Sequence, residues 1–400
     1  MANVFKKQLK IARLFFIISA LYGLSLRLYK VVDFIPIAYK NILQAHSHVT
    51  FLGWGFLGII SIIGLVFYPK KINDSRYLKI LFNSMATMLL GMLISFPLQG
   101  YKLFSIVFLS VFLLCSYLYI YAILKALKAE KSNSALFIKT GIYYYYLSSI
   151  AIWAVAIITS KYGKIDLYYN AVYFYLHFLY NGFFVFALFG LLLKYIELKA
   201  IKINNTNVHY FYVFTNLACI PAYTLSLLWN KMPTAIYYVA GIAAMLQIIS
   251  LYYLFQLYKV YSKTLVSKQI KILSLVVFVS YFLKIILQFS SAFPIVIATS
   301  VAFKSFFIIG YLHLFTLGFM SLFIFLLLTL FPKIILNKIG LLLFVTGIFL
   351  SELLLFGNGM LLVFFKNGLV SIDWLLLITS ALMPIGLLLI YFYSTNSSSE

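Results

Sequence analysis

The chain has 400 residues, of which 64% are hydrophobic and 10% charged, with a formal net charge of +23. Average globular domains are roughly half apolar and a quarter charged, so this composition excludes a soluble fold and indicates a polytopic membrane protein. Lysines on the cytoplasmic face of a membrane explain the positive charge better than nucleic-acid binding does.

A bilayer-spanning helix needs roughly 20 apolar residues, and twelve stretches of the sequence meet this rule. We therefore predict an all-α, polytopic fold with one twelve-helix transmembrane domain, residues 1–393, followed by a polar tail, 394–400. The first span follows a basic N-terminus without a small-residue cleavage site, so it is expected to be an uncleaved helix. No convincing internal repeat is evident. The predicted spans are 9–31, 42–68, 78–98, 103–125, 137–160, 168–194, 208–229, 234–258, 270–290, 304–331, 339–357 and 371–393.

Basic residues are distributed unevenly over the connections between these spans. Roughly two thirds of the 31 Lys and Arg residues fall at the N-terminus and on the connections that share its side, which is the pattern expected of cytoplasmic loops. Both termini are therefore predicted to be cytoplasmic.

Four of the five histidines fall inside predicted spans: His46 and His48 in the second, His177 in the sixth and His313 in the tenth. Ionisable groups inside lipid-spanning segments are costly, so they are functional candidates by default. These three spans all run from outside to inside, and at 1.5 Å per residue the imidazoles lie at depths of roughly 6–14 Å. The sequence thus predicts one shared pocket near the outer surface. His209 opens the seventh span on the other side and is expected to be interfacial.

Imidazole chemistry narrows what such a pocket could hold. Neutral imidazole binds haem iron, copper and zinc, and two imidazoles from facing helices can hold a haem in a bundle. His46 and His48 point about 200° apart on a helix, so they cannot easily bind the same metal. One could bind a haem while the other faces a propionate, a second site or a neighbouring helix. The structural alternative for each histidine is a hydrogen bond to a neighbouring helix.

Two stretches carry a resemblance to a known family. The residues AHSHVTFLGWGF at 45–56 and YLHLFTLGFMSLFIF at 311–325 resemble the second and tenth helices of the haem–copper oxidase subunit I superfamily. That superfamily includes the nitric oxide reductase large subunit and the smaller NnrS-like membrane proteins. The resemblance implies a twelve-helix bundle and a haem, of b type, held by His46 or His48 and by His313. His177 falls on the helix that supplies one copper ligand in the oxidases.

The sequence also departs from that family. Tyr311 stands where the oxidases have the first histidine of a His-x-His pair, and the seventh span lacks their adjacent histidines. The usual binuclear oxygen-reducing centre is therefore incomplete. One haem held by the second and tenth helices remains an option. A mononuclear metal site of His48, His177 and His313 is another, because three imidazoles and an open position suit copper or zinc.

Further polar residues within the spans are interpreted as supporting groups. Tyr173 is four residues before His177 and could fix its tautomer, while Asn181 and Tyr311 lie near the histidines in sequence. Lys284 in the ninth span and Glu352 in the eleventh are predicted to form an intramembrane ion pair. The alternative role for Glu352 is to pass protons toward the histidine site.

The function expected from these observations is that of a haem-binding, and in one version also copper-binding, protein of the bacterial cytoplasmic (inner) membrane. It would act in electron transfer or in the handling of nitric oxide or oxygen, and oxidoreductase is the enzyme class that these roles suggest. Its expected partners are the lipid bilayer and a redox partner or gas ligand, with no nucleic acid. Two alternatives are a cofactor-free secondary transporter with a His-lined outer cavity and a metal-dependent membrane hydrolase.

Overall fold

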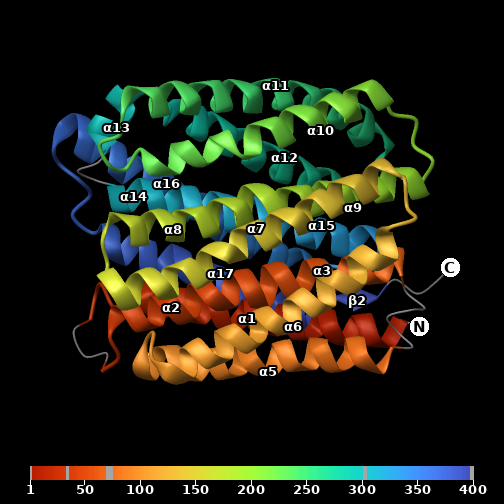
Figure 1. The fold of residues 1–400 in the computed structure, drawn as a ribbon, viewed down its shortest axis with the longest axis horizontal. Helices are drawn as coiled ribbons and strands as arrows, with labels where there is room; N and C mark the ends of the chain where they lie inside the picture. Colours follow the sequence, from red (N-terminus) through yellow and green to blue (C-terminus); the bar gives the residue numbers. More distant parts are fainter. Residues whose placement is uncertain (1, 33–35, 69–74, 301–303, 397–400) are drawn as a thin grey trace. The chain divides into compact units, whose positions relative to one another are not determined.

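The computed structural model describes residues 2–32, 36–68, 75–300 and 304–396, and it is helical throughout apart from two short strands (Figure 1). Within those residues, eleven helices are long and apolar enough to cross a membrane. This confirms the prediction of an all-α, multi-pass membrane protein.

The predicted seventh span, 208–229, is not one α-helix. It consists of α10 (Asn205–Cys219) followed by the 3₁₀-helix η3 (Pro221–Leu227). Proline lacks a backbone N–H and its ring clashes with the preceding turn, so Pro221 ends the α-helix. The count of twelve spans stays a prediction, because α10 by itself is too short to be one of the eleven.

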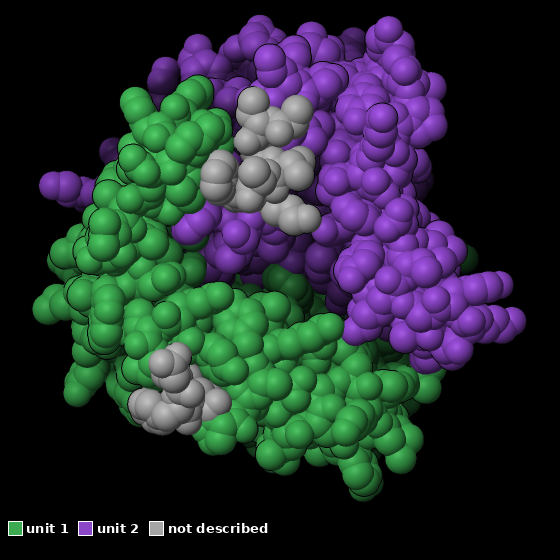
Figure 2. Space-filling view, turned by 90° about the vertical axis from the view of Figure 1, so that its left-hand side faces the viewer, with its two compact units in different colours: residues 1–129, 324–400 green, residues 130–323 purple. Residues whose placement is uncertain are grey.

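Contacts divide the chain into two compact units, coloured separately in Figure 2. The first unit comprises residues 1–129 and 324–400, and the second comprises residues 130–323. Of the predicted polar tail, Thr395 and Asn396 form a strand, and residues 397–400 lie outside the described part of the chain.

The first unit is built around α1, which packs against the second predicted span and against the last helix. Phe16 of α1 stacks on the fully buried Trp54 at 4.6 Å, and both rings contact Phe325; Phe344 meets Phe16 edge-on at 5.6 Å. The elements of this unit are α1 (Ala2–Leu28), α2 (Tyr39–His48), η1 (Val49–Phe56), α3 (Leu57–Phe67), α5 (Arg76–Gln99), α6 (Leu103–Leu127), β1 (Ile334–Ile335), α16 (Lys338–Phe365), α17 (Ile372–Tyr393) and β2 (Thr395–Asn396).

The two ends of the described chain lie at the same end of the first unit (Figure 1). Lys10 and Arg13 of α1 lie 5.8 and 5.6 Å from the centroid of the Tyr391 ring in α17. Strands β1 and β2 pair antiparallel beside them. This arrangement is compatible with termini on one side of a membrane, and their cytoplasmic location stays a prediction.

The second unit holds the remaining spans around a core of aromatic rings. Phe189 lies 5.0 Å from Phe211 and 5.1 Å from Tyr281, and it also contacts Phe319. Besides α10 and η3, its elements are α7 (Asn133–Tyr162), α8 (Asp166–His177), η2 (Phe178–Phe184), α9 (Val185–Leu198), α11 (Thr234–Thr264), α12 (Lys268–Ser290), α13 (Pro294–Ser300), α14 (Lys304–His313) and η5 (Leu314–Ser321). Helix α15 (Leu322–Leu330) continues across the boundary between the units.

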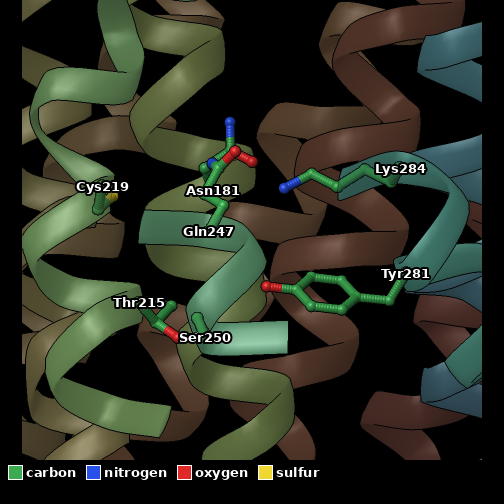
Figure 3. Close-up of a pocket in the computed structure, with 7 residues that line it drawn as sticks. All are labelled: Asn181, Thr215, Cys219, Gln247, Ser250, Tyr281 and Lys284. Carbon is green, nitrogen blue, oxygen red and sulfur yellow. Dashed lines mark hydrogen bonds between the residues drawn. The ribbon is translucent and has the colours of Figure 1, made fainter. Parts of the chain in front are cut away.

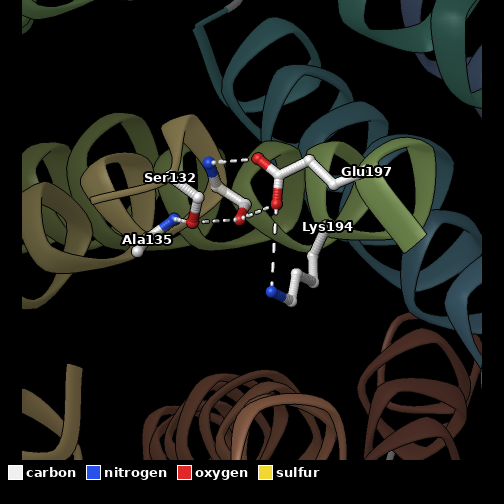
Figure 4. A network of polar contacts seen from close by, with 5 residues as sticks. Ser132, Ala135, Lys194 and Glu197 are labelled. Carbon is white, nitrogen blue, oxygen red and sulfur yellow. Dashed lines mark hydrogen bonds and ion pairs between the residues drawn. The ribbon is translucent and has the colours of Figure 1, made fainter. Parts of the chain in front are cut away.

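A polar network at the start of α7 ties that helix to α9 (Figure 4). Ser132 caps α7 by accepting a hydrogen bond from the Ala135 N–H. The Glu197 carboxylate accepts hydrogen bonds from the Ser134 N–H at 3.1 Å and from its hydroxyl at 2.6 Å, and Lys194 lies 3.9 Å away. A carboxylate at a helix N-terminus satisfies unpaired N–H groups and interacts favourably with the helix dipole.

Replacing Glu197 with alanine is expected to reduce stability modestly, because it removes the carboxylate that accepts from both the N–H and the hydroxyl of the buried Ser134. The expected cost is about 1 kcal/mol, and thermal unfolding in detergent should show a melting temperature lower by about 2–4 °C. The matched control is Glu130→Ala, at an exposed carboxylate just before α7, which should unfold like the wild type. Equal melting temperatures for both variants would contradict the capping role.

Candidate functional site

Among the described residues, three stretches of π-helix lie in the most buried spans. Each begins directly after a histidine: η1 after His48, η2 after His177 and η5 after His313. Between 78% and 89% of each of these spans is buried, against at most 56% for the other eight candidate spans among the described helices. π-Helical turns are rare and occur frequently at functional sites, so the structure singles out the same three histidine-bearing helices as the sequence.

The same short pattern recurs in all three stretches. A histidine is followed five residues later by a glycine and then by an aromatic residue: His48 with Gly53, His177 with Gly182, and His313 with Gly318. Hydrogen bonds in a π-helix join residues five apart, so this spacing matches the local structure. The pattern fixes only three positions, and the residues between them differ among the three stretches.

Each glycine of this repeat lies against the span that precedes it. A Cβ atom would lie 2.8 Å from Phe15 Cβ if added to Gly53, 2.5 Å from Tyr144 Cβ at Gly182, and 3.0 Å from Ser280 Oγ at Gly318. These neighbours belong to α1, α7 and α12, the spans directly before the second, sixth and tenth. The glycines allow close helix approach, so each π-helical stretch packs closely against the span that precedes it.

The ring of His46 is held by α1 in the manner of a metal ligand. Its Nδ1 lies 2.8 Å from the Ser19 carbonyl oxygen, so Nδ1 carries the proton and donates. Gly23 of α1 leaves room for the ring, because a Cβ there would lie 2.9 Å from the imidazole Cε1. Among the described residues Nε2 has no hydrogen-bond partner. Metal-bound histidines usually donate their other ring N–H to a carbonyl or carboxylate, so His46 fits a haem iron.

His48 faces the opposite side of the helix, as its two-residue spacing from His46 predicts. Its Nδ1 donates to the Gln44 carbonyl at 2.9 Å, and its Nε2 lies 2.9 Å from the Tyr101 hydroxyl. The ring also stacks on Phe96 at 4.6 Å. Both ring nitrogens are therefore engaged within the first unit, and a metal could bind His48 only if Tyr101 moved.

His177 is almost completely buried, at 3% exposure, and its ring is satisfied by protein groups. Its Nε2 donates to the Cys219 carbonyl at 2.8 Å, and its Nδ1 accepts from the Asn181 amide at 3.1 Å. Tyr173, which was expected to fix the tautomer, instead packs 5.9 Å from Trp229. The Cys219 carbonyl fixes the tautomer, because it can only accept, and Asn181 occupies the remaining lone pair, so the ring has none free for a metal.

His313 ends α14 where η5 begins, two residues after Tyr311. The two π-helical stretches of the second unit meet nearby, because Tyr180 of η2 stacks on Phe315 of η5 at 5.0 Å. The structure thus brings the helices of His177 and His313 side by side within one unit. His46 and His48 belong to the other unit, and the convergence of all four imidazoles stays a prediction.

The ionisable residues Arg27 and Glu352 lie in the first unit, and Lys284 lies in the second. Arg27 of α1 lies within electrostatic range of both Glu352 and His46, inside the first unit. No described residue forms a hydrogen bond with either carboxylate oxygen of Glu352. Lys284 belongs to the second unit, so its predicted ion pair with Glu352 stays a prediction. His209 is exposed, as an interfacial side chain should be.

No group of three His, Cys, Asp or Glu side chains lies close enough to hold a metal ion within the described ranges. This agrees with the engaged nitrogens of His48 and His177. A haem needs only one or two imidazoles. The absence of a three-residue cluster from the described ranges therefore concerns the three-histidine metal site and not the haem site. That metal site of His48, His177 and His313 stays a prediction, and it would require two of its members to release their present partners.

Comparison with known proteins identifies the fold. No protein-family model matches the chain, and no curated protein matches it in sequence. A chain from a cryo-EM structure of a haem–copper terminal oxidase dimer is similar, with a TM-score of 0.69 and 13% sequence identity, over 98% of this chain and 82% of that chain. The protein is therefore a multi-pass membrane protein whose fold is that of a haem–copper terminal oxidase chain.

Proposed function

We propose that this protein binds a haem of b type in the bacterial cytoplasmic membrane and acts in electron transfer or in the handling of nitric oxide or oxygen. The fold likeness supports the superfamily, and the arrangement of His46 supports the cofactor. The carrying observation is the hydrogen bond from His46 Nδ1 to the Ser19 carbonyl, which leaves Nε2 without a partner among the described residues. His313 is proposed as the opposing ligand from its match to the tenth helix of the superfamily.

The sequence left open whether His46 or His48 binds the haem, and we assign this role to His46. His46 has the outer hydrogen bond that raises ligand basicity and fixes the ring, whereas His48 uses its Nε2 with Tyr101. We assign His48 to packing against Phe96 and Tyr101. When bound, the haem would supply a site for one-electron transfer or a diatomic ligand, and the chain's own residues would hold and orient it.

Reduction of dioxygen at a haem–copper pair does not fit the residues of the second unit. A copper ion bound to His177 would need a lone pair on its ring. Nδ1 accepts from Asn181 and Nε2 donates to Cys219, so both nitrogens are committed. We therefore propose a haem protein without the oxidase copper site. A soluble or membrane redox partner would supply electrons.

The direct test is the absorption spectrum of the full chain, purified from cells supplied with haem precursor. A Soret band, with a pyridine haemochrome spectrum of b type and a stoichiometric haem content, is the expected result. Colourless protein that is folded and monodisperse would refute the cofactor assignment. It would leave the secondary transporter as the better reading, to be tested by solute or proton flux in proteoliposomes.

A further inference from the structure

A small polar cavity lies inside the second unit, among residues that the proposed haem site does not use. Its volume is about 10 Å³, and residues of η2, α10, α11 and α12 line it (Figure 3). The ammonium of Lys284 in α12 points toward the amide groups of Asn181 and Gln247. All three side chains are at most 8% exposed. A lysine buried this deeply requires an account of what solvates its charge.

Of the three hydroxyl groups that line the cavity, those of Thr215 and Ser250 are already satisfied. Thr215 donates to the Phe211 carbonyl at 2.6 Å, and its hydroxyl lies 2.6 Å from that of Ser250. The Asn181 amide nitrogen is used by His177. These contacts leave the amide oxygens, the ammonium and the Tyr281 hydroxyl as the groups available to an occupant of the cavity.

Three polar groups around the cavity have unmet hydrogen bonds. Oδ1 of Asn181 and Oε1 of Gln247 are buried acceptors without a partner in the described part of the chain. Within the second unit, Lys284 makes no hydrogen bond or ion pair with a described residue, and its ammonium lies 5.3 Å from the centroid of the Tyr281 ring. An unpaired buried acceptor and an unpaired buried charge are both costly.

One water molecule would meet all three needs. A cavity of roughly 10–15 Å³ holds one water, which needs two to four polar partners. Such a water would accept a hydrogen bond from Lys284 Nζ and donate one proton each to Asn181 Oδ1 and Gln247 Oε1. Water-mediated bonds of this kind are nearly as favourable as direct ones.

We propose that this cavity is a binding site for a single ordered water molecule that joins Lys284, Asn181 and Gln247. The water holds the Asn181 oxygen toward Lys284 and so keeps its amide nitrogen toward His177 Nδ1. Lys284 and Gln247 thereby act as positioning residues for the His177 ring. A small anion is the competing occupant, and the two carbonyl oxygens disfavour it because their lone pairs would face its charge.

Whether the melting temperature of a Gln247 variant falls or rises tests for water at this site. Gln247→Met keeps the size of the side chain and removes the Oε1 acceptor. If water occupies the cavity, the variant loses a hydrogen bond and its melting temperature falls. The matched control is Gln288→Met, because Gln288 of α12 also has an unpaired buried oxygen but does not line the cavity. That variant should melt higher, since it loses an unpaired polar atom. Shifts of about 2–4 °C are expected in each direction. A rise for both variants would mean that the cavity is dry.

A second measurement does not depend on the variants. A high-resolution map of the full chain should show one spherical peak about 2.7–3.2 Å from Lys284 Nζ and from both amide oxygens. An empty cavity would overturn the proposal. An anomalous peak at this position in crystals soaked in sodium bromide would overturn it as well, because the occupant would then be an anion.

Discussion

Alanine at position 46 is expected to remove the haem Soret band from the purified protein, whereas alanine at position 48 should leave it in place. His46 presents an Nε2 without a described partner and donates Nδ1 to the Ser19 carbonyl, while His48 has both nitrogens engaged. Loss of even an outer hydrogen-bond partner typically costs 10–100-fold in metal affinity, so loss of the ligand should lower haem content by at least about tenfold. His313→Ala should have an effect of the same order.

Haem content per protein, from pyridine haemochrome spectra of equal amounts of monodisperse protein, is the measurement. Ser19→Ala is the matched control: it deletes the hydroxyl that contacts His46 and Thr50 but keeps the carbonyl that accepts from the ring. It should retain the band. Loss of haem in His48→Ala with retention in His46→Ala would reverse the assignment of the ligand. Retention in every histidine variant would contradict histidine ligation altogether.

A methyl group added at Gly182 is expected to destabilise the second unit strongly. The new Cβ would lie 2.5 Å from Tyr144 Cβ and 2.7 Å from its Cγ, which is closer than side-chain carbons approach. Tyr144 cannot rotate away easily, because its hydroxyl donates to the Asn216 side-chain oxygen at 2.8 Å. Overpacking of this kind costs about 1–3 kcal/mol, and each kcal/mol lowers the melting temperature by about 2–4 °C.

Thermal unfolding of Gly182→Ala should be compared with that of Gly241→Ala. Gly241 is also inside a helix, α11, but a Cβ there meets nothing within 4 Å. Alanine is favoured over glycine in a helix by up to about 1 kcal/mol, so this control should be neutral or slightly more stable. If the two variants have the same melting temperature, the contact between Gly182 of η2 and Tyr144 of α7 does not exclude a side chain at position 182.

The sequence by itself predicted the eleven long apolar helices of the described chain and the three of them that carry histidines. Runs of apolar residues must be helical in lipid, because every backbone polar group has to be satisfied within the segment. The four histidines stood out for the same reason, since a polar ring in such a run is costly. The pattern of a histidine and a glycine five residues apart is also present in the sequence. Its five-residue spacing is explained by the π-helical turns, whose hydrogen bonds join residues five apart.

The choice among the histidines, by contrast, was made by tertiary structure. The acceptor for His46 is a carbonyl 27 residues earlier in the chain, and the acceptor for His177 is a carbonyl 42 residues later. The cavity beside Lys284 likewise gathers side chains from four elements. Local sequence determines which segments become membrane-spanning helices, because a long apolar run must satisfy its backbone polar groups within itself. Which ring nitrogen keeps a free lone pair depends on the neighbouring helix, and only packing brings that neighbour into contact.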